Sequence, residues 1–133
     1  MYNRGRGVTI DYDQAVSWYR RAAEGGYAWA QYFLGLKLSL GQGVAQNEKE
    51  AANWYRRAAE QEHALAQYNL ANMYLKGTAI PKSLESAYQW ALIANAYAHP
   101  DAESLSQEIE LHITPQQQDT ITKSVKTWIR KHR

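Results

Sequence analysis

The sequence predicts an all-α fold, an αα-superhelix of helix-loop-helix repeats, from three features that agree with one another. A set of residues returns every 36 positions, apolar residues within each unit follow helical spacing, and N-cap residues recur at one phase of the repeat. At 133 residues the chain has the size of one ordinary domain. We therefore expect a single solenoid, in which stacked units bury a continuous core that no unit could bury alone.

The 36-residue period is carried by tryptophan, glycine, alanine and β-branched positions. The matching sets are Trp18, Trp54 and Trp90, then Gly5, Gly41 and Gly77, then Ala15, Ala51 and Ala87, and then Val8, Val44 and Ile80. Residues 18–24 and 54–60 share the sequence Trp-Tyr-Arg-Arg-Ala-Ala-Glu, and residues 30–32 and 66–68 share Ala-Gln-Tyr. Agreement at so many positions indicates repeated structural units.

Each unit is predicted to contain two helices, which we name helix A and helix B. Helix A covers roughly 29–40 and 65–76, and helix B covers roughly 12–24, 48–61 and 84–97. Good N-cap residues precede each helix B, namely Asp11, Asn47 and Ser83. Asn47 and Glu50 also have the spacing of a capping box.

The repeats divide the chain into four segments. We expect a partial repeat without helix A at 1–28 (unit one), a repeat at 29–64 (unit two), a degenerate repeat at 65–99 (unit three) and a C-terminal helical cap at 100–133. Unit one lacks helix A because Met1-Tyr2 aligns with Met73-Tyr74, the last turn of a helix A. The chain is therefore expected to be a fragment of a longer protein or to begin with an open edge.

The C-terminal cap is predicted to be a hairpin of two helices. Pro100-Asp101 and Thr114-Pro115-Gln116-Gln117 begin the helices, and their apolar faces carry Ala102, Leu105 and Ile109, then Ile121, Val125 and Trp128. Residues 101–119 hold five acidic and no basic side chains, and residues 120–133 hold five basic and no acidic ones. Antiparallel helices would set these charges side by side, and the alternative is a nucleic-acid role for Lys123, Lys126, Arg130, Lys131 and Arg133.

Small and aromatic residues are expected to share the packing between helices. Four alanines would let helices approach closely, namely Ala15, Ala22, Ala51 and Ala58. The neighbouring Trp-Tyr pairs would fill the gaps between units, and Trp54 is expected to be mostly buried between units two and three.

The repeat resembles the Sel-one-like repeat (SLR), a relative of the tetratricopeptide repeat. The resemblance is carried by Leu34-Gly35, Gly41-Gln42-Gly43-Val44, Asn47, Ala51, Trp54-Tyr55, Arg57-Ala58-Ala59-Glu60 and Ala66-Gln67-Tyr68-Asn69-Leu70. It covers residues 1 to about 98 and implies an αα-superhelix that serves as an adaptor in protein complexes, often bacterial and often tied to signalling or the cell envelope. Some exported relatives bind β-lactam compounds and are stapled by cysteines, which this chain lacks.

Unit three departs from the family pattern at two positions. Ala79 replaces the second glycine of the loop, and Ala91 replaces the tyrosine of the Trp-Tyr pair. Because alanine tolerates positive φ poorly, the position shared by Gly43 and Ala79 is not expected to require it. The retained Gly77 is the expected left-handed helix terminus.

The function predicted is a non-catalytic scaffold or adaptor that binds a protein or peptide along its concave face. In related helical repeats helix A lines that face, which here offers Tyr32, Lys37, Ser39, Tyr68, Asn72 and Lys76. Tyrosine suits such a surface because it gives contact area at low entropic cost. The alternatives are a purely structural spacer within a longer repeat protein, and a hydrolase or β-lactam-binding relative.

No motif indicates a catalytic residue, a metal or a cofactor. Gly5-Arg6-Gly7 and Gly41-Gln42-Gly43 follow no predicted strand and recur with the repeat, so we interpret them as inter-helix loops rather than phosphate loops. His63 and His99 occupy one slot in successive units, too far apart to share a metal. The net charge of +2 does not favour a nucleic-acid partner.

The cellular compartment is left open by the sequence. The chain has no cysteine, no apolar run of membrane-spanning length and no apolar signal segment at its start. Because the start looks truncated, the cytoplasm and the periplasm both stay open.

One helix A carries a second apolar stripe beside its core stripe. Trp29, Phe33, Leu36 and Leu40 form this stripe, and the equivalent residues one repeat later are Leu65, Asn69, Asn72 and Lys76. The fold itself does not demand apolar residues there. The stripe therefore either packs on a helix A that precedes Met1 or forms a docking groove, which a second copy could fill. Both interpretations expect an exposed stripe and weak self-association through the N-terminal edge.

Overall fold

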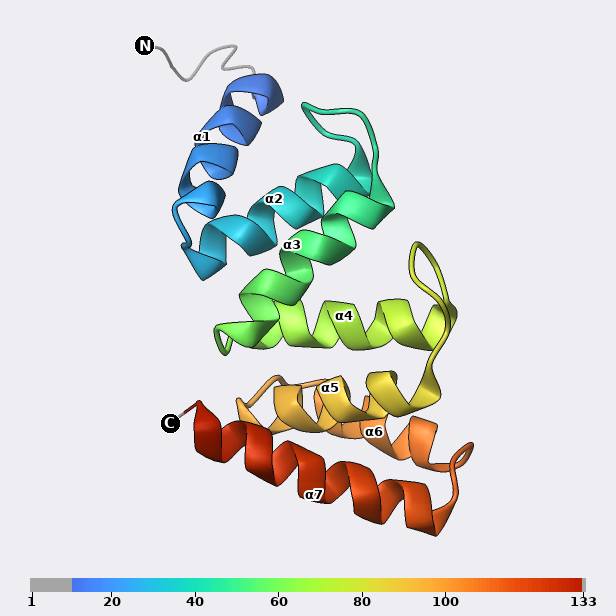
Figure 1. Ribbon diagram of the computed structural model, residues 1–133. Coiled ribbons are helices and arrows are strands. Elements are labelled where there is room, and N and C mark those ends of the chain that lie inside the picture. The colour runs from blue at the N-terminus through green and yellow to red at the C-terminus, as the bar shows by residue number, and fades with distance from the viewer. Residues whose placement is uncertain (1–10, 133) are drawn as a thin grey trace.

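The computed structural model describes residues 11–132, which form seven α-helices and no β-strand (Figure 1). The helices are α1 (Tyr12–Glu24), α2 (Ala28–Leu40), α3 (Glu48–Glu60), α4 (Ala64–Lys76), α5 (Leu84–Ala96), α6 (Ala102–Glu110) and α7 (Pro115–Lys131). The all-α prediction is confirmed, and the predicted bounds of helices A and B agree with these to within one residue. The expectations placed on residues 1–10 and on Arg133 lie outside the described residues.

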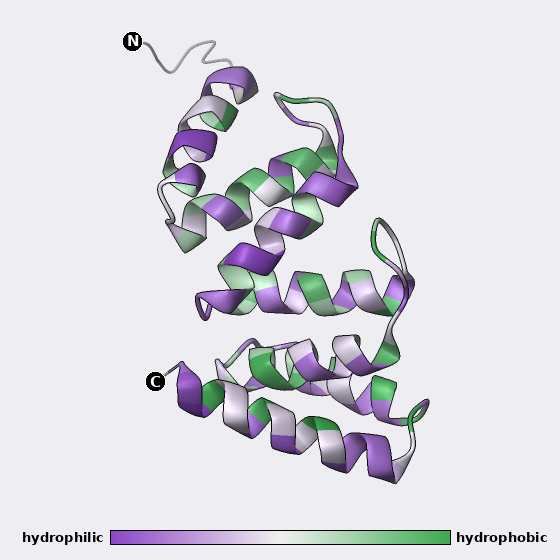
Figure 2. Cartoon of the chain, in the orientation of Figure 1, coloured by the Kyte–Doolittle hydropathy of each residue, from purple (hydrophilic) through white to green (hydrophobic). Residues whose placement is uncertain are grey.

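Consecutive helices form a stack in which α2 and α4 are helix A, and α1, α3 and α5 are helix B. Within units α2 packs on α3 and α4 on α5, and between units α1 packs on α2 and α3 on α4. The stack runs from α1 at one end to α6 and α7 at the other (Figure 1). Figure 2 shows hydrophobic residues concentrated on α2, while α1 and α3 are mostly hydrophilic. Helices α2 and α3 each pack against two other helices, so the difference lies in their exposed side chains. Those of α2 include Trp29, Phe33 and Leu40, whereas the exposed side chains of α3 are polar or charged.

The N-caps of helix B are those predicted. The side-chain oxygens of Asp11, Asn47 and Ser83 each accept the backbone N–H three residues later, at 3.0, 3.0 and 3.1 Å. The capping box expected at Asn47 is not completed, because the Glu50 carboxylate accepts hydrogen bonds from Arg20 and Trp54 instead. That prediction was wrong because a stronger, partly buried partner competes for the carboxylate.

The loops after helix A require left-handed backbone at two positions. Gly41 and Gly77 end α2 and α4 with φ of 71° and 69°, as predicted for Gly77. Gly43 has φ of 78° and Ala79 has φ of 45°, so the expectation that this position avoids positive φ was wrong. The loop keeps its path in both repeats, and the left-handed backbone of Ala79 destabilises the fold by roughly 1–2 kcal/mol.

Helix A and helix B of unit two cross at Gly35. A Cβ atom added there would lie 2.8 Å from Tyr55 Cε1 and 3.3 Å from the backbone oxygen of Ala51. Glycine is therefore needed opposite the Tyr55 ring, which is 3% exposed. In unit three the equivalent residues are Ala71 and Ala91, both fully buried. A tyrosine on helix B is thus matched by glycine on helix A, and an alanine by alanine.

A buried glutamine ties each helix A to the helix B before it. Gln31 Nε2 donates to the backbone oxygen of Ala23, and Gln67 Nε2 donates to that of Ala59, both at 3.1 Å. Both glutamines are at most 3% exposed, so these hydrogen bonds form away from water. The repeated Ala-Gln-Tyr triplet is the sequence signal of this contact, although the pattern alone did not reveal its role.

The C-terminal cap consists of α6 and α7, which both pack on α5. Thr114 and Gln117 form the predicted capping box, with Pro115 in the first turn. The predicted apolar faces are buried at Ala102, Leu105, Ile109, Ile121 and Val125, and Trp128 is half-buried. Ala102 keeps the phase of Ala66, so α6 occupies the place of a helix A while α7 closes the stack over α5.

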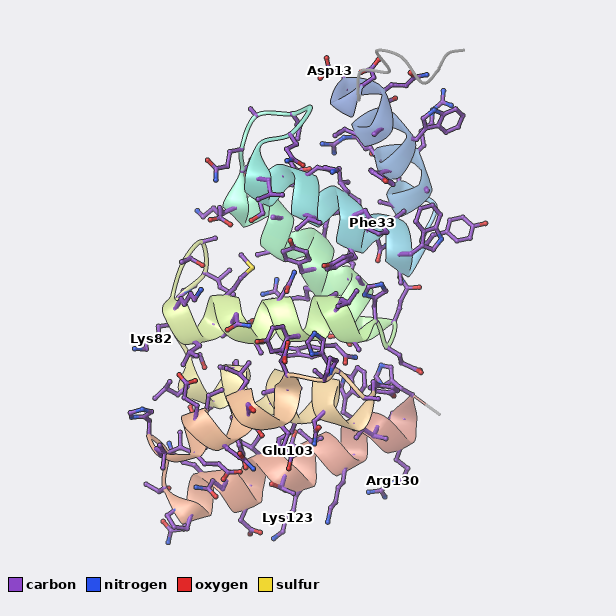
Figure 3. The ribbon with its side chains drawn as sticks, turned by 180° about the vertical axis from the view of Figure 1, so that it is seen from behind. Asp13, Phe33, Lys82, Glu103, Lys123 and Arg130 are labelled. Carbon is purple, nitrogen blue, oxygen red and sulfur yellow. The ribbon has the colours of Figure 1, made fainter. Side chains whose placement is uncertain are left out.

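The charges of the tail do not pair across its two helices. Within residues 11–132 no ion pair joins α6 to α7, and Lys123 pairs with Asp119 inside α7 at 3.2 Å. Because α7 packs mainly on α5, its basic side chains point into solvent, as Figure 3 shows for Lys123 and Arg130. The expected side-by-side pairing was therefore wrong, and the nucleic-acid role of these residues stays untested.

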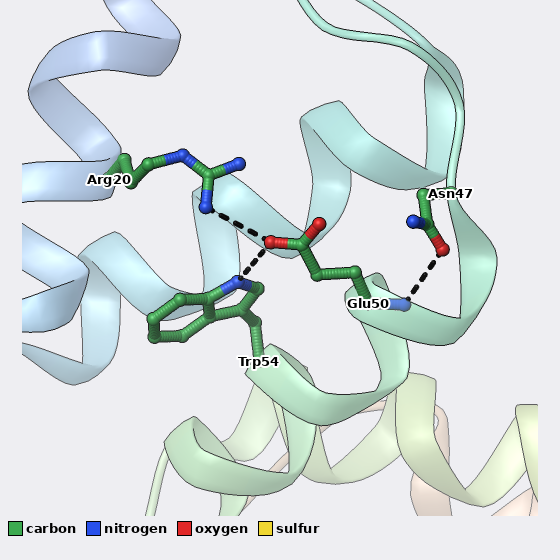
Figure 4. A network of polar contacts seen from close by, with 4 residues as sticks. All are labelled: Arg20, Asn47, Glu50 and Trp54. Carbon is green, nitrogen blue, oxygen red and sulfur yellow. Dashed lines mark hydrogen bonds and ion pairs between the residues drawn. The ribbon is translucent and has the colours of Figure 1, made fainter.

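Equivalent tryptophans differ in exposure. Trp54 and Trp90 are 7% and 8% exposed, whereas Trp18 is 61% exposed. The burial predicted for Trp54 is confirmed, but its indole N–H is turned toward α1 rather than unit three, since it donates to the Glu50 oxygen that Arg20 also contacts (Figure 4). The expectation that Trp18 fills a gap between units was wrong, because the described helices leave its side of α1 uncovered.

Trp54→Ala is expected to lower the free energy of unfolding by about 3–5 kcal/mol, because it removes a large buried ring. Trp18→Ala is the matched control at the same position of helix B, and it should cost less than about 1 kcal/mol. Urea unfolding followed by circular dichroism measures both losses. Equal losses in the two variants would contradict the difference in burial.

Candidate functional site

A polar network joins α1 to α3 (Figure 4). Arg20 Nη1 donates to Glu50 Oε2 at 3.0 Å, and Trp54 Nε1 donates to the same oxygen at 3.2 Å. Burial alone would raise the pKa of Glu50, but the two hydrogen bonds and the Arg20 charge outweigh it and hold the pKa below its ordinary value. Glu50 is therefore ionised at neutral pH, and Arg20 balances its charge.

Beside this network lies an open depression of about 410 Å³, lined by Glu50, Asn53, Trp54, Arg56 and Arg57. The Arg57 guanidinium carbon lies 4.7 Å from the centre of the Trp54 ring, and Arg56 Nη2 donates to the Tyr74 hydroxyl at 2.9 Å. The lining contains two arginines, an amide, an indole and a carboxylate, which can form hydrogen bonds and charge pairs with a ligand. Sequence reasoning missed this depression, and its signal is the Arg-Arg pair that follows Trp-Tyr.

Tyrosine–histidine stacks repeat along helix A. The ring centroids of Tyr32 and His63 are 5.0 Å apart, and those of Tyr68 and His99 are 4.1 Å apart. Burial lowers the pKa of His63 below its ordinary value, and its Nδ1 accepts the Ala66 N–H at 3.3 Å. A neutral imidazole thus stacks on the tyrosine ring in unit two, and the ring of His99 stacks on Tyr68 in unit three.

The other helix-A residues predicted to bind a partner differ in whether their side chains already form hydrogen bonds within the chain. Lys37 Nζ donates to a loop glutamine at 3.1 Å, and Ser39 Oγ donates to a carboxylate at the start of α3 at 2.9 Å. Asn72 Nδ2 donates to the backbone oxygen of Tyr68 at 3.3 Å. Lys76 is exposed. Their role in binding stays a prediction.

The second stripe of α2 is exposed at three of its four positions. Trp29, Phe33 and Leu40 are 50%, 38% and 56% exposed, and Leu36 is half-buried. The rings of Trp29 and Phe33 also contact Tyr19 of α1, with centroids 6.4 and 5.5 Å apart. Figure 3 shows Phe33 on α2 beside α1.

The polar residue one repeat later has a different partner. Asn69 stands where Phe33 stands, and its side chain hydrogen-bonds to that of Tyr55. Phe33 instead stacks on the ring of Tyr19, the equivalent of Tyr55. Phe33 therefore packs on the half-buried ring of Tyr19, whereas Asn69 contacts the buried Tyr55.

Within residues 11–132 no three His, Cys, Asp or Glu side chains gather where they could hold a metal ion. In the same part of the chain, no helix has both the length and the apolar character needed to cross a lipid bilayer.

The model of the Sel1 repeat family matches residues 1–27, 30–63 and 64–96, which is more than half of the chain. The chain belongs to the Sel1 repeat family. The resemblance inferred from the sequence is thereby confirmed. Sel1 repeats generally mediate protein–protein interactions, and their fold is typically a non-catalytic scaffold.

Two solved structures show the same fold. A Sel1 repeat protein from Oxalobacter formigenes is 37% identical, with a TM-score of 0.73, over 77% of this chain and 42% of its own. A protective antigen present in uropathogenic Escherichia coli strains, which displays an SLR fold, is 29% identical, with a TM-score of 0.83, over 94% of this chain and 27% of its own. This chain therefore spans less than half the length of either protein. A comparison with curated proteins found no match.

Glu50→Gln is expected to reduce stability near pH 7 and to matter less in acid. Because the folded pKa of Glu50 lies below its unfolded value, ionised Glu50 stabilises the fold above roughly pH 4.3, and this contribution is lost as pH falls through the folded pKa. Melting temperatures of the wild type and the variant should therefore converge between about pH 5 and pH 3. The exposed Glu24→Gln is the control, and a difference that stays constant over this range would refute the assignment.

Weak self-association is expected through the exposed stripe of α2. Sedimentation across a hundredfold concentration range should show an average mass that rises with concentration, and Phe33→Glu should abolish the rise. Gln116→Glu, which adds the same charge on α7, should leave the rise intact. A strict monomer that Phe33→Glu does not alter would count against this use of the stripe.

Proposed function

We propose that this chain is a protein–protein interaction scaffold that binds a protein or peptide along its concave helix-A face, formed by Tyr32, Ser39, Tyr68, Asn72 and Lys76. The observation that supports it most directly is the pair of tyrosine rings, held one repeat apart by their histidine stacks. Both rings are half-buried, so each offers part of its surface to a partner.

Fixed tyrosines suit recognition for an energetic reason. A side chain already held by a stack has less conformational freedom to lose on binding, so more of its contact energy is expressed as affinity. The exposed ammonium of Lys76 adds a charge at the end of α4 that can pair with a carboxylate of the partner. The two tyrosines repeat with the period of the fold, which favours an extended segment as the ligand.

The competing function is a structural spacer that only orients neighbouring repeats. Under that function the stacks set the angle between units, and no partner depends on the tyrosine hydroxyls. A hydrolase or β-lactam-binding role has less support, because the depression beside Trp54 contains no nucleophile with an adjacent base.

The amount of a partner captured by the wild-type chain should fall at least tenfold with the triple variant Tyr32→Phe, Tyr68→Phe, Lys76→Glu. These changes keep both ring stacks, so the fold should survive while the hydroxyls and the positive charge are removed. The measurement is quantitative mass spectrometry of pull-downs from the organism that encodes the chain, with melting temperatures alongside. Lys126→Glu on α7 is the control, and equal capture by both variants would favour another surface or the spacer.

A further inference from the structure

Arginine recurs at one position of helix B, and its partner changes from one unit to the next. Arg20 and Arg56 are equivalent, one repeat apart. Arg20 Nη1 donates to Glu50 Oε2 at 3.0 Å, which balances its charge at the junction of units one and two (Figure 4). One repeat later a serine stands in place of the glutamate, because Ser86 is the equivalent of Glu50. The position that supplies a carboxylate to Arg20 therefore supplies none to Arg56.

Arg56 is held by neutral groups instead. Its Nη2 donates to the Tyr74 hydroxyl at 2.9 Å, and its Nη1 makes a longer contact of 3.5 Å with Asn53 Oδ1. Among residues 11–132 no carboxylate forms an ion pair with Arg56 or Arg57. The sequence of residues 1–10 contains no aspartate or glutamate. Neither part of the chain therefore supplies a side-chain carboxylate to these two arginines.

Arg57 is positioned by the aromatic ring beside it. Its guanidinium carbon lies 4.7 Å from the centre of the Trp54 ring, and the side chain is exposed. A guanidinium that lies over an aromatic face keeps the N–H groups at its edge available to donate. Arg56 and Arg57 thus place positioned donors in the lining of one open depression of about 410 Å³. Donors that are already positioned lose less side-chain freedom when a ligand binds.

The fold does not require charge at these two positions. In unit three Leu92 and Ile93 replace the arginines, and Ile93 is fully buried. There α7 packs on α5, and the Trp128 ring lies edge-on to Trp90, with centroids 5.8 Å apart. The depression on α3 lies within the stack, because α3 packs on both α2 and α4. Its charged, open lining is therefore a property of unit two and not of an end of the stack.

We propose that this depression binds an acidic peptide segment of a partner protein, whose carboxylates accept hydrogen bonds from Arg56 and Arg57. The pairing of Arg20 with Glu50 is an example of the same chemistry within the chain. Hydrogen bonds from arginine to a carboxylate are charge-assisted, and they are stronger than those between neutral groups. The lining belongs to helix B and not to the helix-A face, so the inference does not rest on the proposed function.

A nucleic acid fits the depression less well than a peptide. The ionised Glu50 places a negative charge in the lining, and the net charge of the chain is only +2. Binding to a phosphate backbone depends on several positive side chains that follow the strand. Two adjacent arginines beside a carboxylate match a short acidic segment instead.

Binding is measured with a fluorescein-labelled hexaglutamate peptide, in which every side chain carries a carboxylate. Titration with the full 133-residue chain, at concentrations where it sediments as a monomer, should give a saturable rise in fluorescence anisotropy. Labelled hexaglutamine has the same length without the charges. It should bind about tenfold more weakly or less, because it cannot form charge-assisted hydrogen bonds.

The two arginines are tested together. The double variant Arg56→Gln, Arg57→Gln should weaken hexaglutamate binding by about tenfold or more. Its matched control is Lys126→Gln, Arg130→Gln, which removes the same charge from exposed positions of α7 and should change the affinity by less than about threefold. Circular dichroism checks that both variants stay folded.

A second variant places the absent carboxylate within the chain. Ser86→Glu introduces the residue type of Glu50 at the equivalent position, so it should pair with Arg56 and compete with the peptide. Hexaglutamate binding should fall by about threefold or more, whereas Gln116→Glu on α7, which adds the same charge, should leave it unchanged. Ser86→Glu keeps both arginines, so it tests the proposal even if the double variant unfolds.

Four results would overturn the proposal. Equal affinity for hexaglutamate and hexaglutamine would show that carboxylates are not recognised. Equal losses in the arginine variant and its α7 control would show a general attraction between charges. Tighter binding of inorganic phosphate or of a single-stranded oligonucleotide than of hexaglutamate would assign the depression to phosphate groups. Self-association that is abolished by Arg56→Gln, Arg57→Gln would identify a second copy of the chain as the occupant.

Discussion

Helix A and helix B of one repeat approach so closely that the residue at their crossing must match the side chain opposite it. In unit two that match is Gly35 against the Tyr55 ring, and in unit three the equivalents are Ala71 and Ala91. The close approach is what buries the alanines of helix B completely and lets a two-helix unit contribute to a dry core. The contacts between units depend on this distance, because the spacing of the two helices within a unit sets which side chains reach the next unit.

Polar contacts then fix how one unit sits on the next. Gln31 and Gln67 join each helix A to the preceding helix B, and Arg20 and Glu50 join α1 to α3. The glutamine amides donate away from bulk water and the Glu50 carboxylate has a charged partner, so each contact favours one arrangement of the units over nearby ones. A binding surface with regular spacing needs that rigidity, because tyrosines one repeat apart can serve one ligand only if their separation is fixed.

Local rules made the helices, their N-caps and the capped tail predictable, since each depends on residues within one turn or one period. What escaped prediction depends on distant segments. Glu50 was expected to complete a capping box, but Arg20, 30 residues earlier, takes its carboxylate. Ala79 adopts positive φ because the loop keeps the path that glycine allows one repeat before. Trp18 has the sequence neighbours of Trp54, yet its exposure depends on what stands beside α1. The tyrosine–histidine stacks escaped for the same reason, because each tyrosine and its histidine lie 31 residues apart in the chain.

Because the repeated helices are nearly identical, a helix A could pack on the wrong helix B while the chain folds. The residue at the crossing prevents only some of these wrong pairings. The extra methyl of Ala71 suits Ala91 on α5 but not Tyr55 on α3, so side-chain size steers α4 to its own unit. No such bias separates α1 from α3, since Tyr19 and Tyr55 offer the same face to α2. Chain connectivity makes that choice, through the loop that leads from α2 into α3, together with the Ser39–Glu48 hydrogen bond, since Tyr12 stands on α1 where Glu48 stands on α3. In an exchange of segments between two chains the loop no longer imposes this choice. Helix α2 could then pack in the same way on α1 or on α3.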